Sequence, residues 1–150
     1  MSYISDMRRY IGHAPMLCVG ATVAVLNDNK ILLNLRSDTH TWGIPGGAAE
    51  LGETLEDTAA RELKEETNLL ANSFILLNVF SGGNFYFKYP NGDELYSVIA
   101  LYLANGVTGN LKINDGESLE LKYFSRDELP KLESRAKVLI DYLCEKRYIL

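Results

Sequence analysis

The segment that most constrains this chain is residues 61–66 (RELKEE), which would place Glu62, Glu65 and Glu66 on one face of a helix. Successive helical residues turn by about 100°, so Glu65 and Glu66 lie at about −60° and about +40° from Glu62. Like charges at these spacings repel, and the negative end of the helix dipole disfavours them further. Such a cluster at the edge of a core suits Mg²⁺, which prefers oxygen ligands shared with substrate phosphates.

A glycine-rich loop precedes this segment. Gly46 and Gly47 lie in the loop, Thr54 is the expected cap of a helix over residues 55–67, and Asp57 completes a capping box. Glycine lets backbone amides and carbonyls approach a ligand closely. Taken alone, a glutamate-rich helix face is most often a solvated surface, and a glycine loop is most often a plain turn. The combination of the two, in this order, favours a metal site.

Together the loop and the helix resemble the signature of the Nudix (MutT-like) hydrolase family. That signature runs Gly, five residues, Glu, seven residues, Arg-Glu, an aliphatic residue, any residue, Glu-Glu, any residue, Gly and an aliphatic residue. Here it extends from Gly47 through Glu53 and residues 61–66 to Leu69, and it departs only at Asn68, which replaces the final glycine. Asparagine is the next-best residue for a left-handed helix end, so we expect the same backbone path and a nearly neutral Asn68→Gly substitution.

The resemblance covers roughly residues 19–130 and implies a fold. We expect one Nudix hydrolase domain over residues 1–150, with an N-terminal helical extension over residues 1–16. The implied fold class is α+β, an α/β/α sandwich with a central mixed sheet and a catalytic loop-helix. Sequence patterns alone predict a loop over 36–52, helices over 2–10 and 133–146, and strands over 18–26, 30–35, 73–80, 85–89, 94–103 and 121–124.

The resemblance also implies a reaction, namely water attack on a phosphorus of a nucleoside diphosphate linked to a second group. The implied cofactor is Mg²⁺, with Mn²⁺ as the alternative, because cations screen the polyanionic diphosphate. By matching positions, Glu62, Glu65 and Glu66 are the expected metal ligands, and the Gly46 carbonyl can add one more. Glu53 is expected to bind the metal or orient the attacking water, and we count it with Glu65 and Glu66 as catalytic.

Two further roles are expected around these ligands. Arg61 is interpreted as structural, since it can pair with Glu53 or with Glu65 one turn on. The general base is sought downstream of the signature, because some family members use a carboxylate on a later loop or strand. Glu117 and Glu120 are the candidates, and Glu120 is favoured because it begins the family-like closing strand; a solvent-facing strand residue is the competing interpretation of Glu120.

Candidate substrate-binding residues are Arg36, Gly47 and Tyr86. A guanidinium fork matches phosphate geometry, although an ordinary surface arginine explains Arg36 equally well. Tyr86 falls in the window where family members that cleave dinucleoside polyphosphates tend to have tyrosine and ADP-ribose-cleaving members tend to have proline. This tilts the prediction weakly away from ADP-ribose, because aromatic residues in a strand core would look the same. Trp42 is expected in the core.

Charge and composition limit the classes of partner that we expect for this chain. The formal net charge is −5 and the longest basic cluster is Arg8-Arg9, so a surface for duplex nucleic acid is not expected. No apolar run is long enough to cross a bilayer, and the only cysteines, Cys18 and Cys144, do not form a disulfide framework. We therefore expect a cytoplasmic protein with a small phosphorylated nucleotide-type substrate and no membrane partner; the family resemblance adds a homodimer as an option.

Two alternative functions are retained. A Nudix domain acting on the 5′ end of RNA is expected to have a basic groove, and this acidic sequence does not indicate one. A non-catalytic nucleotide-binding sensor usually has a damaged signature, whereas here each position assigned to chemistry is intact.

Overall fold

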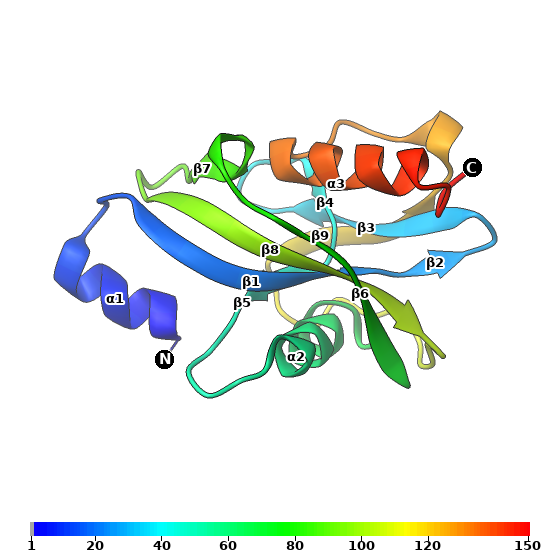
Figure 1. Ribbon diagram of the computed structural model, residues 1–150, viewed down its shortest axis with the longest axis horizontal. Helices are drawn as coiled ribbons and strands as arrows, with labels where there is room; N and C mark the ends of the chain where they lie inside the picture. The colour runs from blue at the N-terminus through cyan, green and yellow to red at the C-terminus, as the bar shows by residue number, and fades with distance from the viewer. Residues whose placement is uncertain (1) are drawn as a thin grey trace.

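The strands form two β-sheets in the computed structural model, which describes residues 2–150 (Figure 1). The mixed sheet has the order β5–β1–β8–β6, with β7 also paired to β8; in chain order these are β1 (Met16–Ala24), β5 (Gly46–Ala48), β6 (Ser73–Phe80), β7 (Tyr86–Lys88) and β8 (Glu94–Asn105). The antiparallel sheet contains β2 (Leu26–Asn27), β3 (Lys30–Arg36), β4 (Trp42–Gly43) and β9 (Ser118–Phe124). The helices are α1 (Tyr3–Ile11), α2 (Leu55–Thr67) and α3 (Ser134–Glu145), with 3-10 turns η1 (Gly83–Phe85) and η2 (Arg126–Glu128). Met1, part of the predicted extension, lies outside the described residues.

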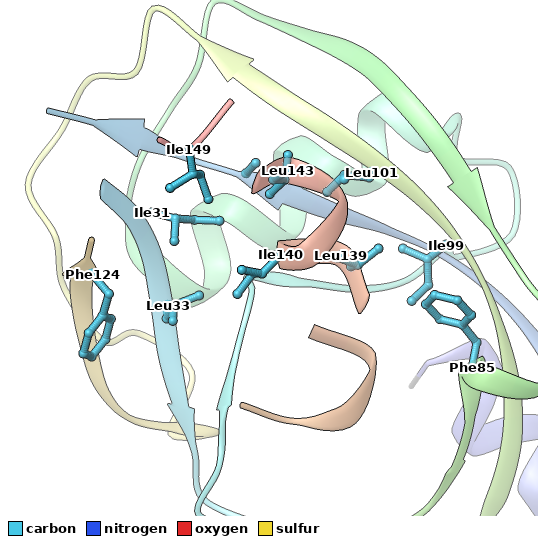
Figure 2. Close-up of a cluster of buried hydrophobic side chains, with 11 residues drawn as sticks. Ile31, Leu33, Phe85, Ile99, Leu101, Phe124, Leu139, Ile140, Leu143 and Ile149 are labelled. Atoms are coloured by element: carbon cyan, nitrogen blue, oxygen red, sulfur yellow. The ribbon is translucent and has the colours of Figure 1, made fainter. Parts of the chain in front are cut away.

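Helices α2 and α3 lie on opposite sides of the strands (Figure 1). The α3 side chains Leu139, Ile140 and Leu143 are buried with residues of β3, β8 and β9, as Figure 2 shows. On the other side, Ala59 and Leu63 of α2 are buried against β1 and β8. Helices α2 and α3 therefore each bury one apolar stripe against strands, which confirms the predicted α+β sandwich with a mixed sheet. The second, antiparallel sheet was not predicted.

The segments 18–26 and 30–35, predicted as successive strands, pair with each other as a hairpin only next to the turn that joins them. Leu26 and Asn27 pair with β3, and the turn residues Asp28 and Asn29 have φ angles of 50° and 59°. β1 itself leaves β3 and pairs in parallel with β8 and antiparallel with β5. Its residues 20–24 are all buried. A strand buried on both faces belongs in the centre of a covered sheet, which is why β1 joins the larger sheet.

The segment predicted as a loop, residues 36–52, is more ordered than expected because it contains β4 and β5. Both strands are short, and β5 consists of Gly46, Gly47 and Ala48. Glycine and proline in this segment carry weak strand propensity, so their pairing is imposed by β1 and β3 and could not be predicted locally. Trp42 packs against the core, where its ring centroid lies 4.8 Å from that of Phe124, as predicted.

The caps of α2 agree with the sequence. Thr54 and Asp57 form the reciprocal capping box, and Asn68 ends the helix in the left-handed region with φ 66° and ψ 13°. These caps fix where α2 begins and ends, and so fix which residues face the loop that precedes it. Among residues 2–150, no helix combines the length and the apolar character needed to span a bilayer. Cys18 and Cys144 are free thiols.

Candidate active site

A cavity of about 500 Å³ opens between the two sheets, beside α2 and the start of α3. Its wall combines backbone from β1 and β5 with side chains from β3, β8, α2 and α3. Glu62, Glu66 and Glu117 are the glutamates on its α2 side, and Glu133 lies on its α3 side. Elements from both halves of the chain are needed to enclose this space.

The glycines of β5 allow α2 to approach the sheet closely. Gly47 lies opposite Ala21 of β1, and a Cβ atom on Gly47 would overlap the carboxylate of Glu62. A Cβ on Gly46 would overlap the carbonyl oxygen of Ala21. Neither glycine has a positive φ, so the requirement is for space and not for an unusual backbone conformation. The paired glycines therefore set the position of Glu62 directly against the backbone of β5.

Glu66 is the most deeply placed acid of the cluster. Its side chain is 6% exposed, and its Oε2 accepts a hydrogen bond of 2.8 Å from the backbone amide of Gly46. Burial raises the pKa of Glu66 well above its ordinary value, and the neighbouring charge of Glu62 raises it further. Burial likewise raises the pKa of Glu62, although Arg61 opposes the rise. These carboxylates lack enough compensating charge within the protein, which is the condition under which a bound cation is stabilising.

The loop before β9 brings two more acids to Glu66. One carboxylate oxygen from each of Glu66, Asp115 and Glu117 lies within 4.8 Å of the others. Burial raises the pKa of Glu117, and the charge of Asp115 adds to the effect. Hard oxygen ligands converging from a helix and a loop fit a divalent cation such as Mg²⁺. Asp115 was not anticipated from the sequence, where only the turn chemistry of Asn114-Asp115-Gly116 marks the loop.

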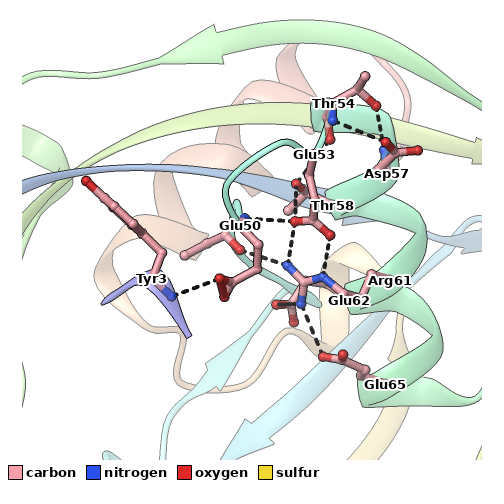
Figure 3. Close-up of polar contacts among 10 residues, drawn as sticks. Tyr3, Glu50, Glu53, Thr54, Asp57, Thr58, Arg61, Glu62 and Glu65 are labelled. Atoms are coloured by element: carbon pink, nitrogen blue, oxygen red, sulfur yellow. Dashed lines mark hydrogen bonds and ion pairs between the residues drawn. The ribbon is translucent and has the colours of Figure 1, made fainter. Parts of the chain in front are cut away.

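Arg61 organises the acids on the outer side of α2 (Figure 3). Its Nε donates to Glu53 at 2.7 Å, and its Nη1 donates to Glu62 at 2.9 Å and to Glu65 at 3.3 Å. A further bond of 2.9 Å reaches the carbonyl of Ala48. These bonds fit the structural role predicted for Arg61, because one guanidinium links the loop, the helix start and two candidate ligands.

Glu53 is held inside this network. Its carboxylate accepts hydrogen bonds from Arg61, from the Glu50 amide and from the Thr58 hydroxyl. The bonds from Arg61 contribute most to lowering the pKa of Glu53 to about 2. Glu53 is absent from the cavity wall, whereas Glu65 is half exposed and borders a shallower recess outside Glu62. The structure therefore places Glu62 and Glu66 facing the cavity, and Glu53 and Glu65 behind or beside them.

The two candidates for the general base occupy different places. Glu117 lines the cavity and belongs to the carboxylate cluster. Glu120 is an exposed residue of β9, opposite Leu35 of β3, and is absent from the cavity wall. Tyr86 is also absent from the wall, because its hydroxyl donates to Glu94 and its ring lies 5.2 Å from that of Tyr96.

Arg36 lies in the cavity wall, as expected for a ligand-binding residue. Its Nε and Nη2 donate to Asp38 at 3.0 and 2.7 Å, and its guanidinium lies 5.4 Å from the Phe87 ring centroid and 6.0 Å from that of Tyr89. Stacking and pairing hold the guanidinium in one orientation. Tyr89, three residues after Tyr86, is the aromatic side chain from this region that reaches the wall.

The wall near α3 was not anticipated from the sequence. Arg135 lies 4.2 Å from the Phe87 ring centroid, donates to Glu133 at 3.0 Å and donates to Ser97 at 3.0 Å. Asn34 of β3 also lines the cavity, and its side-chain nitrogen donates to Ser118 at 3.0 Å. No local motif marks these residues, because they are brought together by strand register and by the start of α3.

Comparisons with known proteins agree with this geometry. The model of the NUDIX domain matches residues 16–143. The ADP-ribose pyrophosphatase of Methanocaldococcus jannaschii is 36% identical over 121 residues, covering 77% of this chain and 67% of that protein. The NAD-capped RNA hydrolase NudC of Vibrio atlanticus is 34% identical over 120 residues, covering 79% of this chain and 41% of that protein. The crystal structure of a MutT NUDIX hydrolase from Burkholderia pseudomallei superposes with a TM-score of 0.72 at 27% identity, covering 84% of this chain and 97% of that one. The signature, which departs from the pattern only at Asn68, the carboxylate-lined cavity and these matches show that the chain belongs to the NUDIX domain family and is a Nudix-type pyrophosphohydrolase.

Proposed function

We propose that this chain hydrolyses the diphosphate linkage of a nucleoside diphosphate derivative with the help of Mg²⁺. The observation that carries the proposal is the convergence of Glu66, Asp115 and Glu117, whose oxygens lie within 4.8 Å of one another. Glu66 and Glu117 line the cavity, and Asp115 borders the recess beside it. Glu62 adds a fourth carboxylate to the same wall. A polyanionic substrate can approach so acidic a wall only when cations neutralise it, and Mg²⁺ supplies that charge and polarises the phosphate.

Separate residues are proposed to hold the cation, to position its ligands and to act as the general base. Glu62 and Glu66 hold the cation from α2, and Asp115 adds a ligand from the loop. Gly46 fixes the carboxylate of Glu66 through its backbone amide. Glu117 accepts the proton of the attacking water, because it lines the cavity and because partial desolvation and the charge of Asp115 raise its pKa, which makes it a stronger base than an unperturbed glutamate. This assignment replaces Glu120, which faces solvent, as the preferred base.

The substrate class follows from the size of the cavity and from the relatives. A space of about 500 Å³ accommodates a nucleotide-sized ligand. One relative is named an ADP-ribose pyrophosphatase, so we place ADP-ribose first among the candidates despite the missing proline after the signature. A second relative is named an NAD-capped RNA hydrolase, which keeps RNA 5′ ends as the alternative. The match to that protein covers 41% of its length.

The test is a panel assay in Mg²⁺ or Mn²⁺ with ADP-ribose, dinucleoside polyphosphates, nucleoside triphosphates, nucleotide sugars and NAD-capped RNA. We expect release of two phosphorylated products from a small nucleotide, and loss of turnover in EDTA. Turnover of capped RNA alone would establish the alternative. Binding of a nucleotide without any turnover would instead establish a sensor.

The identity of the base is tested by a matched pair of variants. Glu117→Gln is expected to lower kcat by about a hundredfold, within the usual range for a general base, while Glu120→Gln stays close to wild type. The two residues are three positions apart and differ in access to the cavity, so the pair controls for general effects on β9 and the residue that precedes it. A large loss in Glu120→Gln with a normal Glu117→Gln would return the role to Glu120.

A further inference from the structure

One polar atom in the cavity wall has no partner in the protein. Asn34 is 7% exposed, and its Nδ2 donates to the hydroxyl of Ser118 at 3.0 Å. Its Oδ1 is fully buried and accepts no hydrogen bond within residues 2–150. Buried amide oxygens in native proteins almost always accept a hydrogen bond, and leaving one unpaired costs about 1–3 kcal/mol. Asn34 lines the cavity, so a group bound there can supply the donor that Oδ1 lacks within the protein.

The other such atom differs in its surroundings. Nε of Arg8 also lacks a hydrogen bond, but it lies 3.6 Å from the carboxylate of Asp93. Opposite charge compensates Arg8, and its other nitrogens donate to backbone carbonyls. Asn34 has no comparable neighbour for Oδ1, and it lines the cavity whereas Arg8 does not. Among the described residues, Asn34 is thus the buried group that points to a ligand.

A glycine lies beside this oxygen. Gly43 of β4 pairs with Asn34, and a Cβ atom on Gly43 would stand 3.4 Å from Oδ1. Gly43 also lines the cavity, so no side chain at position 43 has to be displaced for a bound group to approach Oδ1. A larger residue at position 43 would place its Cβ in contact with the oxygen.

The charges beside Asn34 select a neutral donor. Arg36 is paired with Asp38, and Arg135 is paired with Glu133, so this part of the wall carries no surplus positive charge for a further phosphate. An amide oxygen cannot donate, so it would disfavour a phosphate or carboxylate oxygen. An amino group of a nucleobase or a hydroxyl of a ribose satisfies both conditions. These two groups share the chemistry of a neutral N–H or O–H donor.

We propose that Oδ1 of Asn34 accepts a hydrogen bond from a neutral donor on the nucleoside part of the substrate and so determines substrate specificity. The inference rests on the proposed function, because it assigns the nucleoside to the cavity wall formed by β3 and β4. A site with a buried acceptor discriminates against an analogue that lacks the donor, because binding the analogue leaves the acceptor unpaired. Asn34 therefore recognises the base or the sugar through a hydrogen bond, while the carboxylates of the proposed metal site lie with the diphosphate.

The experiment compares kcat/KM for paired substrates that differ by one donor. For ADP-ribose the pairs remove the 6-amino group of adenine or the 2′-hydroxyl of the adenosine ribose; for dGTP the partner is dITP, which lacks the 2-amino group. The pairs are built on whichever parent the enzyme hydrolyses faster. We expect wild type to favour the donor-bearing member of one pair by about tenfold or more. The pair that responds distinguishes the base from the sugar.

Three variants assign the preference to Oδ1. Asn34→Leu removes the acceptor at similar volume and should bring the responding ratio close to one. Asn34→Asp retains acceptor oxygens and should keep a preference. Gly43→Ala leaves the Asn34–Ser118 bond in place but puts a Cβ 3.4 Å from Oδ1, where it would obstruct an approaching donor. It should therefore also reduce the ratio, and it keeps the test decisive if Asn34→Leu does not fold. Asn78→Leu, on an exposed position of β6, is the matched control and should keep the wild-type ratio.

The outcomes separate this inference from the proposed function. A ratio that collapses in Asn34→Leu and Gly43→Ala, but not in Asn78→Leu, supports the role of Asn34. Normal hydrolysis with unchanged ratios in both cavity variants overturns that role and leaves the hydrolase intact. An equal loss for both members of every pair assigns Asn34 to structure alone and also overturns the inference. No hydrolysis of any parent by wild type overturns the proposed function.

Discussion

The backbone amide of Gly46 donates a hydrogen bond of 2.8 Å to Oε2 of Glu66, and so joins β5 to the last turn of α2. This bond fixes a buried carboxylate that the fold itself does not neutralise, since burial raises the pKa of Glu66 well above its ordinary value. Glu66 is therefore retained at a cost to stability, as is common for groups that bind a cation.

Glu66→Gln should separate activity from stability. The amide oxygen can still accept the Gly46 bond, but the charge that we propose holds the cation is gone, so we expect kcat/KM to fall by about a hundredfold or more. At pH 8 in EDTA the variant should be at least as stable as wild type, because no buried charge remains. Urea unfolding and a Mg²⁺-dependent assay check both parts. A variant that is both inactive and clearly less stable would contradict this explanation.

Metal and pH should affect stability together. Burial raises the pKa values of Glu62, Glu66 and Glu117 in the folded state. A raised pKa means that the folded protein binds more protons than the unfolded chain once the pH exceeds about 4.5, so stability from these groups is lost as the pH rises. If Mg²⁺ binds at these carboxylates as proposed, it should reverse that loss, and its stabilising effect on Tm should be larger at pH 8 than at pH 5. Equal shifts at both pH values would argue against binding at these carboxylates.

Glu53 should show the opposite pH dependence. Arg61 lowers the pKa of Glu53 to about 2 from 4.5, so its contribution to stability is present above pH 4.5 and is lost as the pH falls towards 2. Glu53→Gln should flatten the decline in unfolding free energy between pH 5 and pH 3, measured by urea titration in EDTA. Glu145→Gln, on the exposed face at the end of α3, is the control. A Glu53→Gln protein that declines as steeply as wild type would show that the Arg61 pairing contributes little.

Gly47→Ala should damage activity by sterics alone. The added Cβ would overlap the carboxylate of Glu62, and β5 cannot retreat because it is paired with β1. We expect kcat/KM to fall about tenfold or more, since small displacements of catalytic groups are costly. Gly83→Ala is the matched control, because its Cβ would meet no atom within 4 Å. An active Gly47→Ala enzyme would mean that Glu62 can shift without loss.

Asn68→Gly should not be neutral, contrary to the expectation from the backbone alone. Glycine relieves a left-handed strain of about 1 kcal/mol or less, but it also removes the side chain that donates to the carbonyl of Asn110 at 3.0 Å and accepts from Lys64 at 2.9 Å and Asn114 at 3.4 Å. These bonds tie the end of α2 to the loop that holds Glu117. We expect faster hydrogen exchange over residues 110–117 and a lower kcat. Asn68→Asp, which keeps an acceptor oxygen, should be intermediate. Hydrogen exchange at the wild-type rate in Asn68→Gly would instead support the expectation that this substitution is nearly neutral.

The sequence predicts the elements of the fold better than their partners. The capping box of Thr54 and the left-handed end at Asn68 are local, so they can be predicted from a few neighbouring residues. The pairing of β1 with β8 and of β3 with β9 depends on register between distant segments, which no local pattern encodes. This is why the signature locates Glu62 and Glu66, whereas Asp115 and Asn34 become visible only when the strands are assembled.

The same long-range pairing governs when the site can exist during synthesis. β3 closes against β9, so the cavity wall at Asn34 lacks its Ser118 anchor until residue 118 has been made, and α3 follows later still. The signature helix, complete by residue 67, remains an acidic amphipathic segment without its final partners while residues 68–145 are translated. Nascent chains of this protein should therefore gain the ability to bind Mg²⁺ and nucleotide abruptly once α3 has been made, and not in stages.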